Sequence, residues 1–149
     1  MNIVESFAAY AAAFEETYVD DDWSRLRRYF TEDAVYSTVA EDGAETKFEG
    51  IDAVLDGLRD AVNTFDRRFA TRTVELRGDL RERDGEIIID WDATYTAPGA
   101  PNLRMGGTEH ALYEGNRIRA LRDVIDAGTS KTIADWMTEH GEKLAPSKT

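Results

Sequence analysis

Cysteine is absent from this 149-residue chain, and histidine occurs only twice, as His110 and His140. Without cysteine there can be no disulfide, no thiolate nucleophile and no cysteine-ligated metal. Two histidines are also too few for a histidine-rich metal cage. We therefore expect a protein that holds no metal and uses no cofactor.

Long apolar runs and positive charge are both scarce. No segment approaches the roughly 20 apolar residues that a membrane-spanning helix needs, and the N-terminus lacks the basic and apolar parts of a signal peptide. The 18 basic residues face 30 acidic ones, for a formal net charge of −12. Such a surface repels phosphate backbones. These absences predict a cytoplasmic protein without a membrane or nucleic-acid partner.

Hydrophobic residues make up 42% of the chain, which is ordinary for a globular protein. We expect one domain over residues 1–149, with an ordered core from about residue 3 to residue 144. Apolar residues at helical spacing predict four helices. Their ranges are 3–19, 23–30, 51–65 and about 130–144.

Runs of β-branched and aromatic residues, separated by turn-forming residues, predict six strands. Their ranges are 34–39, 45–48, 69–76, 86–96, 104–113 and 117–125. This order predicts an α+β fold: a curved, cone-shaped antiparallel sheet wrapped around the N-terminal helices, followed by a C-terminal helix. The mouth of such a cone can hold a small-molecule pocket, which we expect between the sheet and the helices at 3–19 and 51–65.

Carboxylates stand within two of these predicted strands. Asp123 shares a strand face with Leu121 and Ile125, although a charged carboxylate on an apolar face is costly. Such a local exception tends to mark a functional site. Asp90 and Asp92 alternate along the strand over residues 86–96, on the face opposite its apolar residues.

The pairing of the last two strands decides which side chains meet. A two-residue turn at Gly115 and Asn116 pairs residue 114 with residue 117, and counting back places Thr108 opposite Asp123. In this register His110 lies diagonal to Asp123 on the same face, and Asp92 shares that face from the next strand. A one-residue change in the length of this loop would shift the register and move these side chains to opposite faces.

This arrangement also predicts a homodimer. If Asp90 and Asp92 line the pocket, an apolar row formed by Ile87, Ile89, Trp91 and Tyr95 lies on the outer face of the sheet. That row is too hydrophobic to remain in water, so a second copy would cover it. If the protein is instead a monomer, the apolar row is the inner one.

Several segments in order resemble the nuclear-transport-factor-2-like superfamily, in its SnoaL-like polyketide cyclase and limonene-epoxide hydrolase branch. The resemblance covers nearly the whole chain and rests on five segments. They are residues 23–30, 31–36, 48–54, 113–118 and 121–126. It implies the same α+β cone.

The resemblance also implies roles for individual residues. Asp123 matches the acid–base aspartate on the last strand, and Asp92 matches the second aspartate of the hydrolase site. Tyr36 matches a tyrosine that positions the nucleophilic water in the hydrolases, and Thr38 stands where an asparagine would be. Asp90 occupies the position of the hydrolase arginine, and the loss of that cation argues against epoxide hydrolysis.

We therefore expect a cofactor-independent enzyme for a hydrophobic carbonyl or polyketide-like molecule. Asp123 would abstract a proton next to the carbonyl for cyclisation or isomerisation, and Asp92 or His110 would donate one. Tyr36, Thr38 and Asp90 would contact the substrate. The alternatives are a non-catalytic ligand-binding or dimerisation domain of the same fold, and an epoxide-hydrolase-like enzyme without its arginine.

Overall fold

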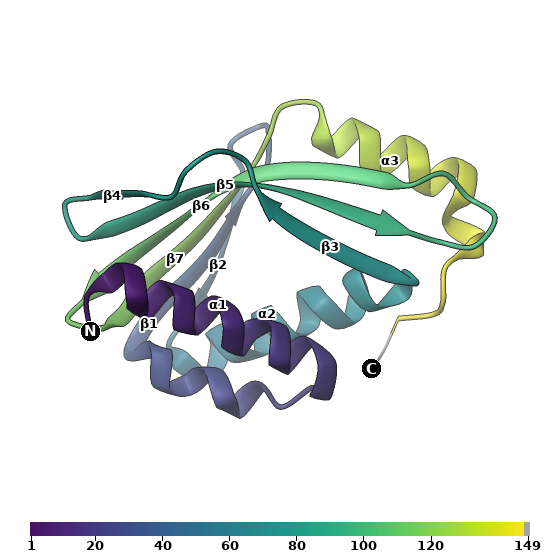
Figure 1. The fold of residues 1–149 in the computed structure, drawn as a ribbon. Coiled ribbons are helices and arrows are strands. Elements are labelled where there is room, and N and C mark those ends of the chain that lie inside the picture. The colour runs from purple at the N-terminus through teal and green to yellow at the C-terminus, as the bar shows by residue number, and fades with distance from the viewer. Residues whose placement is uncertain (148–149) are drawn as a thin grey trace.

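The computed structural model describes residues 1–147. Within them the chain forms one seven-stranded sheet, which curves over two long helices (Figure 1). The strand order is β2-β1-β7-β6-β5-β3, and the short strand β4 pairs with β5 outside this path. The predicted α+β cone is therefore confirmed.

The helices follow the apolar periodicity of the sequence. α1 covers Ile3–Asp20 and α2 covers Ile51–Thr64, while Trp23–Tyr29 forms a 3₁₀ helix, η1. Asn2 caps α1, because its side chain accepts a hydrogen bond from the Glu5 amide. After α2, a short 3₁₀ turn, η2, covers Asp66–Arg68. The C-terminal helix α3 covers Thr129–His140 and is followed by the 3₁₀ turn η3 at Gly141–Lys143.

The strands match the β-branched runs, with differences at their ends. Their bounds are β1 Phe30–Val39, β2 Glu45–Glu49, β3 Thr71–Leu76, β4 Arg81–Arg83, β5 Glu86–Thr96, β6 Leu103–Glu114 and β7 Arg117–Ile125. β1 starts earlier than predicted, at Phe30, and β4 was not predicted at all. β1 and β7 pair in parallel, whereas the other strand pairs are antiparallel.

The predicted register of β6 and β7 is wrong by one residue. The turn pairs Glu114 with Arg117 as expected, but the register shifts between Leu112 and Tyr113. One extra residue in β7 leaves Glu109, rather than Thr108, opposite Asp123. Because successive side chains alternate between faces, this bulge reverses every side-chain relationship beyond it.

The inner face of the sheet, which faces α1 and α2, carries the apolar row of β5. Ile87 and Ile89 belong to the core, and Trp91 and Tyr95 line a cavity on the same face. The expectation that this row lies outside is therefore wrong. The homodimer stays a prediction, and the apolar row no longer supports it because the row is buried inside the protein.

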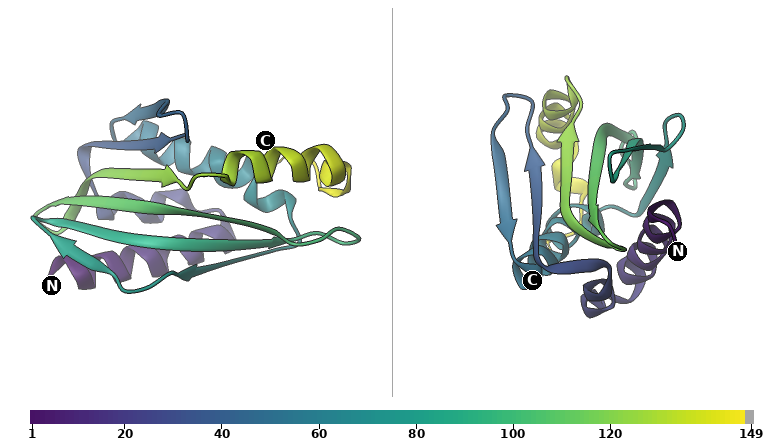
Figure 2. Two further views of the ribbon diagram at one scale, coloured as in Figure 1. Left: turned by 90° about the horizontal axis from the view of Figure 1, so that it is seen from above. Right: turned by 90° about the vertical axis from the view of Figure 1, so that its left-hand side faces the viewer.

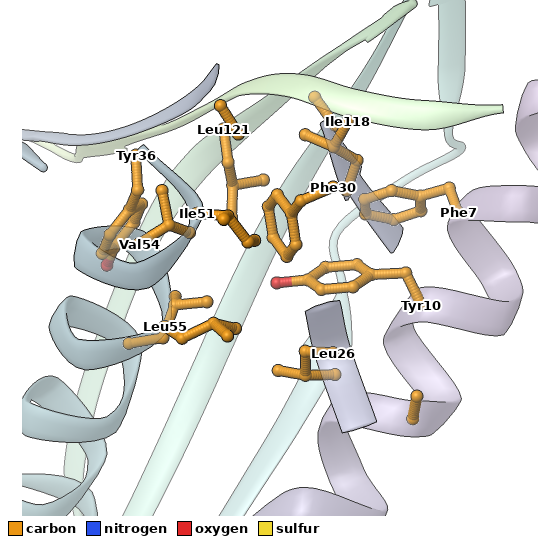
Figure 3. Close-up of a cluster of buried hydrophobic side chains, with 14 of the residues drawn as sticks. Phe7, Tyr10, Leu26, Phe30, Tyr36, Ile51, Val54, Leu55, Ile118 and Leu121 are labelled. Carbon is orange, nitrogen blue, oxygen red and sulfur yellow. The ribbon is translucent and has the colours of Figure 1, made fainter. Parts of the chain in front are cut away.

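Two buried clusters hold the helices on the sheet. The larger one joins Phe7 and Tyr10 of α1, Leu26 of η1 and Phe30 of β1 to apolar residues of α2 (Figure 3). The smaller cluster lies where α3 meets the sheet, and there Trp136 packs on Phe69. Figure 2 shows the helices α1 and α2 on the same side of the sheet. The side chains of these helices and of the strands β3, β5 and β7 leave a cavity between them. Over the described residues, none of the helices has both the length and the apolar character needed to cross a bilayer.

Candidate functional site

A cavity of about 780 Å³ lies between the inner face of the sheet and the helices α1 and α2. Its walls are mostly apolar and include Phe14 of α1, Leu58 of α2 and Trp91 of β5. Val74 and Leu76 of the edge strand β3 also line it, and both are exposed, at 42% and 55%. The cavity lies where the sequence predicted a pocket, and its size suits a small organic ligand.

A pair of carboxyl groups lines this cavity. Glu109 of β6 and Asp123 of β7 are direct cross-strand partners, and both point to the inner face. Directly opposed residues place their Cβ atoms roughly 5 Å apart. Two carboxyl groups at that spacing cannot both ionise easily, because like charges repel strongly away from water.

Burial raises the pKa of both groups. The pKa of Asp123 rises to about 6, chiefly because desolvation penalises its charge. Desolvation and then the charge of Asp123 raise the pKa of Glu109 well above its ordinary value. Because ionisation of one member disfavours ionisation of the other, the pair favours a state in which Asp123 is ionised and Glu109 keeps its proton.

Trp91 favours the ionisation of Asp123. Its indole Nε1 donates a hydrogen bond to Oδ1 of Asp123 at 3.2 Å, which favours the charged form of this carboxyl. Among the described residues, Glu109 has no such donor. The indole lies over Gly107 of β6, where an added Cβ would come within 2.9 Å of Trp91 Cζ2. Gly107 thus leaves the room that Trp91 needs to cross from β5 to β7.

Tyr36 and Thr38 of β1 also line the cavity. Thr38 pairs with Asp123, and Tyr36 pairs with Leu121, through the parallel contact of β1 and β7. Burial raises the pKa of Tyr36, so its phenol stays protonated and can donate a hydrogen bond. Both residues lie in the pocket with Asp123, and their contact with a substrate stays a prediction.

A second polar group lies at another part of the wall. Arg72 of β3 is only 10% exposed and forms ion pairs with Asp66 and with Glu15, each at 3.0 Å. Its guanidinium also lies over the rings of Phe14 and Tyr18, at 5.7 and 5.0 Å. Burial raises the pKa of Asp66 to about 6, although Arg72 opposes this shift.

The three remaining predicted site residues do not share the face of Asp123. Asp90 binds Arg81 at 2.8 Å and accepts a hydrogen bond from Thr108, and these contacts hold its pKa at about 2. Asp92 lies near Arg77 on the same outer face, with its side chain 55% exposed. Neither lines the cavity, because the inner positions of β5 belong to the odd-numbered residues.

The placement of His110 beside Asp123 is also wrong. His110 lies opposite Arg122 on the outer face and contacts Glu86 at 3.2 Å, because of the bulge in β7. The hydrolase-like grouping of Asp92, residue 90 and Asp123 therefore does not form. Only Asp123, Tyr36 and Thr38 of the six predicted residues line the cavity.

Sequence reasoning missed Glu109, although a signal was present. In β6, Glu109 alternates with the apolar residues Met105 and Ala111 and with Gly107. Glu109 is thus a carboxylate on an apolar strand face, just as Asp123 is. The hydrogen bond from Trp91 left no such signal, because it joins strands that are not neighbours.

Within residues 1–147, no three acidic, histidine or cysteine side chains are placed to hold a metal ion. The described site consists of carboxyl groups, hydroxyl groups, one indole and one guanidinium within an apolar cavity. These groups can bind a hydrophobic molecule and move a proton.

Comparison with known proteins supports the fold. No family model matches the sequence, and neither does any curated protein. Among solved structures, a Bacillus subtilis protein described as a presumed isomerase has a TM-score of 0.65 and 17% identity, over 93% of this chain and 96% of its own. Bal32a, from a soil-derived mobile gene cassette, has a TM-score of 0.63 and 16% identity, with 91% and 99% coverage.

A third similar structure names the fold. It is a nuclear-transport-factor-2-like protein of unknown function from Burkholderia pseudomallei, with a TM-score of 0.60 and 16% identity, over 87% of this chain and 95% of its own. The chain therefore has the nuclear-transport-factor-2-like, cystatin-like α+β fold. At these identities the likeness concerns the fold alone, and function has to be argued from the site.

Proposed function

We propose that the protein is a cofactor-independent enzyme that moves a proton next to the carbonyl of a small hydrophobic or polyketide-like molecule. The observation that carries the proposal is the opposed pair of Asp123 and Glu109 in the apolar cavity. One member is ionised and the other protonated near neutral pH, which supplies a base and an acid at one place.

The proposed reaction begins with Asp123. Its ionised carboxylate takes a proton from the carbon next to the carbonyl, and the electron pair of that C–H bond forms an enolate. Protonated Glu109 donates a hydrogen bond to the oxygen that gains charge, and the phenol of Tyr36 can supply a second one. In a substrate whose enolate is conjugated with a carbon–carbon double bond, Asp123 then returns its proton to the far carbon, and the double bond moves. Alternatively, the enolate carbon attacks a second carbonyl and closes a ring, and the alkoxide formed there takes the proton back from Asp123.

The surroundings of Asp123 favour this reading over a pure binding domain. An Asp123 locked in an ion pair with the adjacent arginine would argue for a structural role. Instead, Arg122 points outward to Glu45 at 3.6 Å, and Asp123 faces an open cavity. SnoaL-like cyclases, which the sequence resembles, use an aspartate at this position, and one structural neighbour is described as a presumed isomerase.

Deuterium exchange tests the proposal without knowledge of the natural substrate. A panel of hydrophobic cyclic ketones is incubated with the protein in heavy water, and deuterium next to the carbonyl is followed by NMR. We expect exchange that Asp123→Asn slows by about 10²-fold, because the amide cannot accept the proton. Asp92→Asn is the matched control: it removes the same charge from the outer face and should leave the exchange rate unchanged.

The binding alternative has a distinct outcome. Ketones that bind in the cavity without any exchange above the buffer rate would favour a non-catalytic ligand-binding domain. Exchange that is equal in wild type and Asp123→Asn would show that Asp123 is not the base.

A further inference from the structure

The cavity has an unbalanced charge. Five carboxyl groups line it, those of Glu15, Asp66, Glu75, Glu109 and Asp123. Among the described residues, Arg72 is the one cationic side chain in its wall. Glu15 and Glu75 are exposed at the edge of the cavity, but Asp66, Glu109 and Asp123 are largely buried. The excess of acid therefore extends into the interior of the cavity.

Arg72 is not available to a ligand. Its guanidinium is already shared by Asp66 and Glu15, and it lies over the rings of Phe14 and Tyr18. A ligand carboxylate would have to displace an existing ion pair before it could use this cation. Elsewhere in the cavity the same carboxylate would lose its water and meet the charge of Asp123 without compensation.

The cavity is favourable for a ligand cation. Asp123 has one hydrogen bond from Trp91, and Glu109 has no partner among the described residues, so both have room for a positively charged group. The rings of Tyr36, Trp91 and Phe14 line the same space. An aromatic ring attracts a cation to its face, most strongly where water is excluded.

We propose that this cavity selects its ligands by charge: it takes hydrophobic molecules that carry a basic nitrogen and excludes hydrophobic acids of the same size. The ammonium lies against Asp123 and Glu109, and the apolar remainder contacts the walls. This inference rests on the cavity of the proposed function but concerns which molecules bind there, whether or not they react.

A matched ligand series tests the charge selection. Anthracenylmethylamine, anthracenylmethanol and anthracenecarboxylate share one ring system and differ in charge, and calorimetry measures their affinities for the full-length protein at physiological ionic strength. We expect the amine to bind about tenfold or more tightly than the alcohol, and the carboxylate about tenfold or more weakly. In the double variant Glu109→Gln/Asp123→Asn, the three affinities should converge while the alcohol still binds.

Asp92→Asn distinguishes an effect of the cavity carboxylates from an effect of the protein's net charge of −12. It changes the total charge by the same amount as Asp123→Asn but lies on the outer face, so the preference for the amine should persist. The inference is overturned if the carboxylate binds as well as the alcohol, if the amine gains nothing, or if none of the three binds. An equal loss in Asp92→Asn and Asp123→Asn would also overturn it.

The two proposals can fail separately. A preference for the amine without proton exchange on any ketone would leave the charge selection in place and remove the enzyme. Exchange on neutral ketones without a preference for the amine would support the enzyme and refute the charge selection.

Discussion

The indole of Trp91 on β5 spans β6 and donates a hydrogen bond to Asp123 on β7, at 3.2 Å. The bond is possible because Gly107 lies between them without a side chain. It links the aromatic wall of the cavity to its carboxyl pair. Four testable consequences follow from this geometry and from the charges around it.

Trp91→Phe removes the hydrogen bond and keeps most of the aromatic surface. We expect the pKa of Asp123 to rise above about 6, because the contact that favours its ionised form is lost. Carbon NMR of the carboxyl groups measures this shift. Trp136→Phe is the control, since that indole donates to the Pro101 carbonyl and lines no part of the cavity. An unchanged Asp123 titration in Trp91→Phe would contradict the role given to this bond.

The carboxyl pair predicts how stability depends on pH. The pKa of Asp123 is raised in the folded protein, so the fold is more stable when this carboxyl is neutral. This stability is fully present below pH 4 and is lost as the pH rises through about 6. Asp123→Asn should therefore match wild type near pH 4 and exceed it at pH 8, by on the order of 2 kcal/mol in the free energy of unfolding. Chemical denaturation at both pH values checks this. A variant that is less stable at pH 8 would indicate a structural role for the carboxylate.

The same pair predicts the pH profile of proton exchange. The rate should rise through about pH 6 as Asp123 ionises, and it should fall at higher pH when Glu109 loses its proton. Glu109→Gln removes the acid but retains a hydrogen-bond donor. It should abolish the fall at high pH and lower the maximal rate by about 10-fold or more. A profile identical to that of wild type would exclude Glu109 from the reaction.

Gly107→Ala tests whether the space over β6 is needed. Its Cβ would lie 2.7 Å from the Val124 carbonyl oxygen and 2.9 Å from the Trp91 ring, so backbone and indole must both shift. We expect a loss of about 1–3 kcal/mol in the free energy of unfolding and a changed Trp91 fluorescence. Gly141→Ala is the control, because its nearest neighbour would be 3.6 Å away, an ordinary contact. Wild-type stability in Gly107→Ala would show that the packing there is looser than the structure indicates.

The sequence alone predicted most of the architecture. Periodic apolar residues located α1 and α2, and β-branched runs located the longer strands, because these patterns reflect which side of each element is buried. The same reasoning identified Asp123 as a carboxylate on an apolar face, and it could have identified Glu109.

Only the tertiary structure decided which residues accompany Asp123. The extra residue in β7, opposite Leu112 and Tyr113 of β6, leaves no clear mark in the sequence, yet it turns His110 outward and Glu109 inward. The helices cover one side of β5 and make it the inner face. Trp91 therefore lies in the cavity and Asp92 lies outside it. Local patterns encode which residues share a face, but the partner of each face is set by pairing between strands that are distant in sequence, where a single inserted residue reverses the outcome.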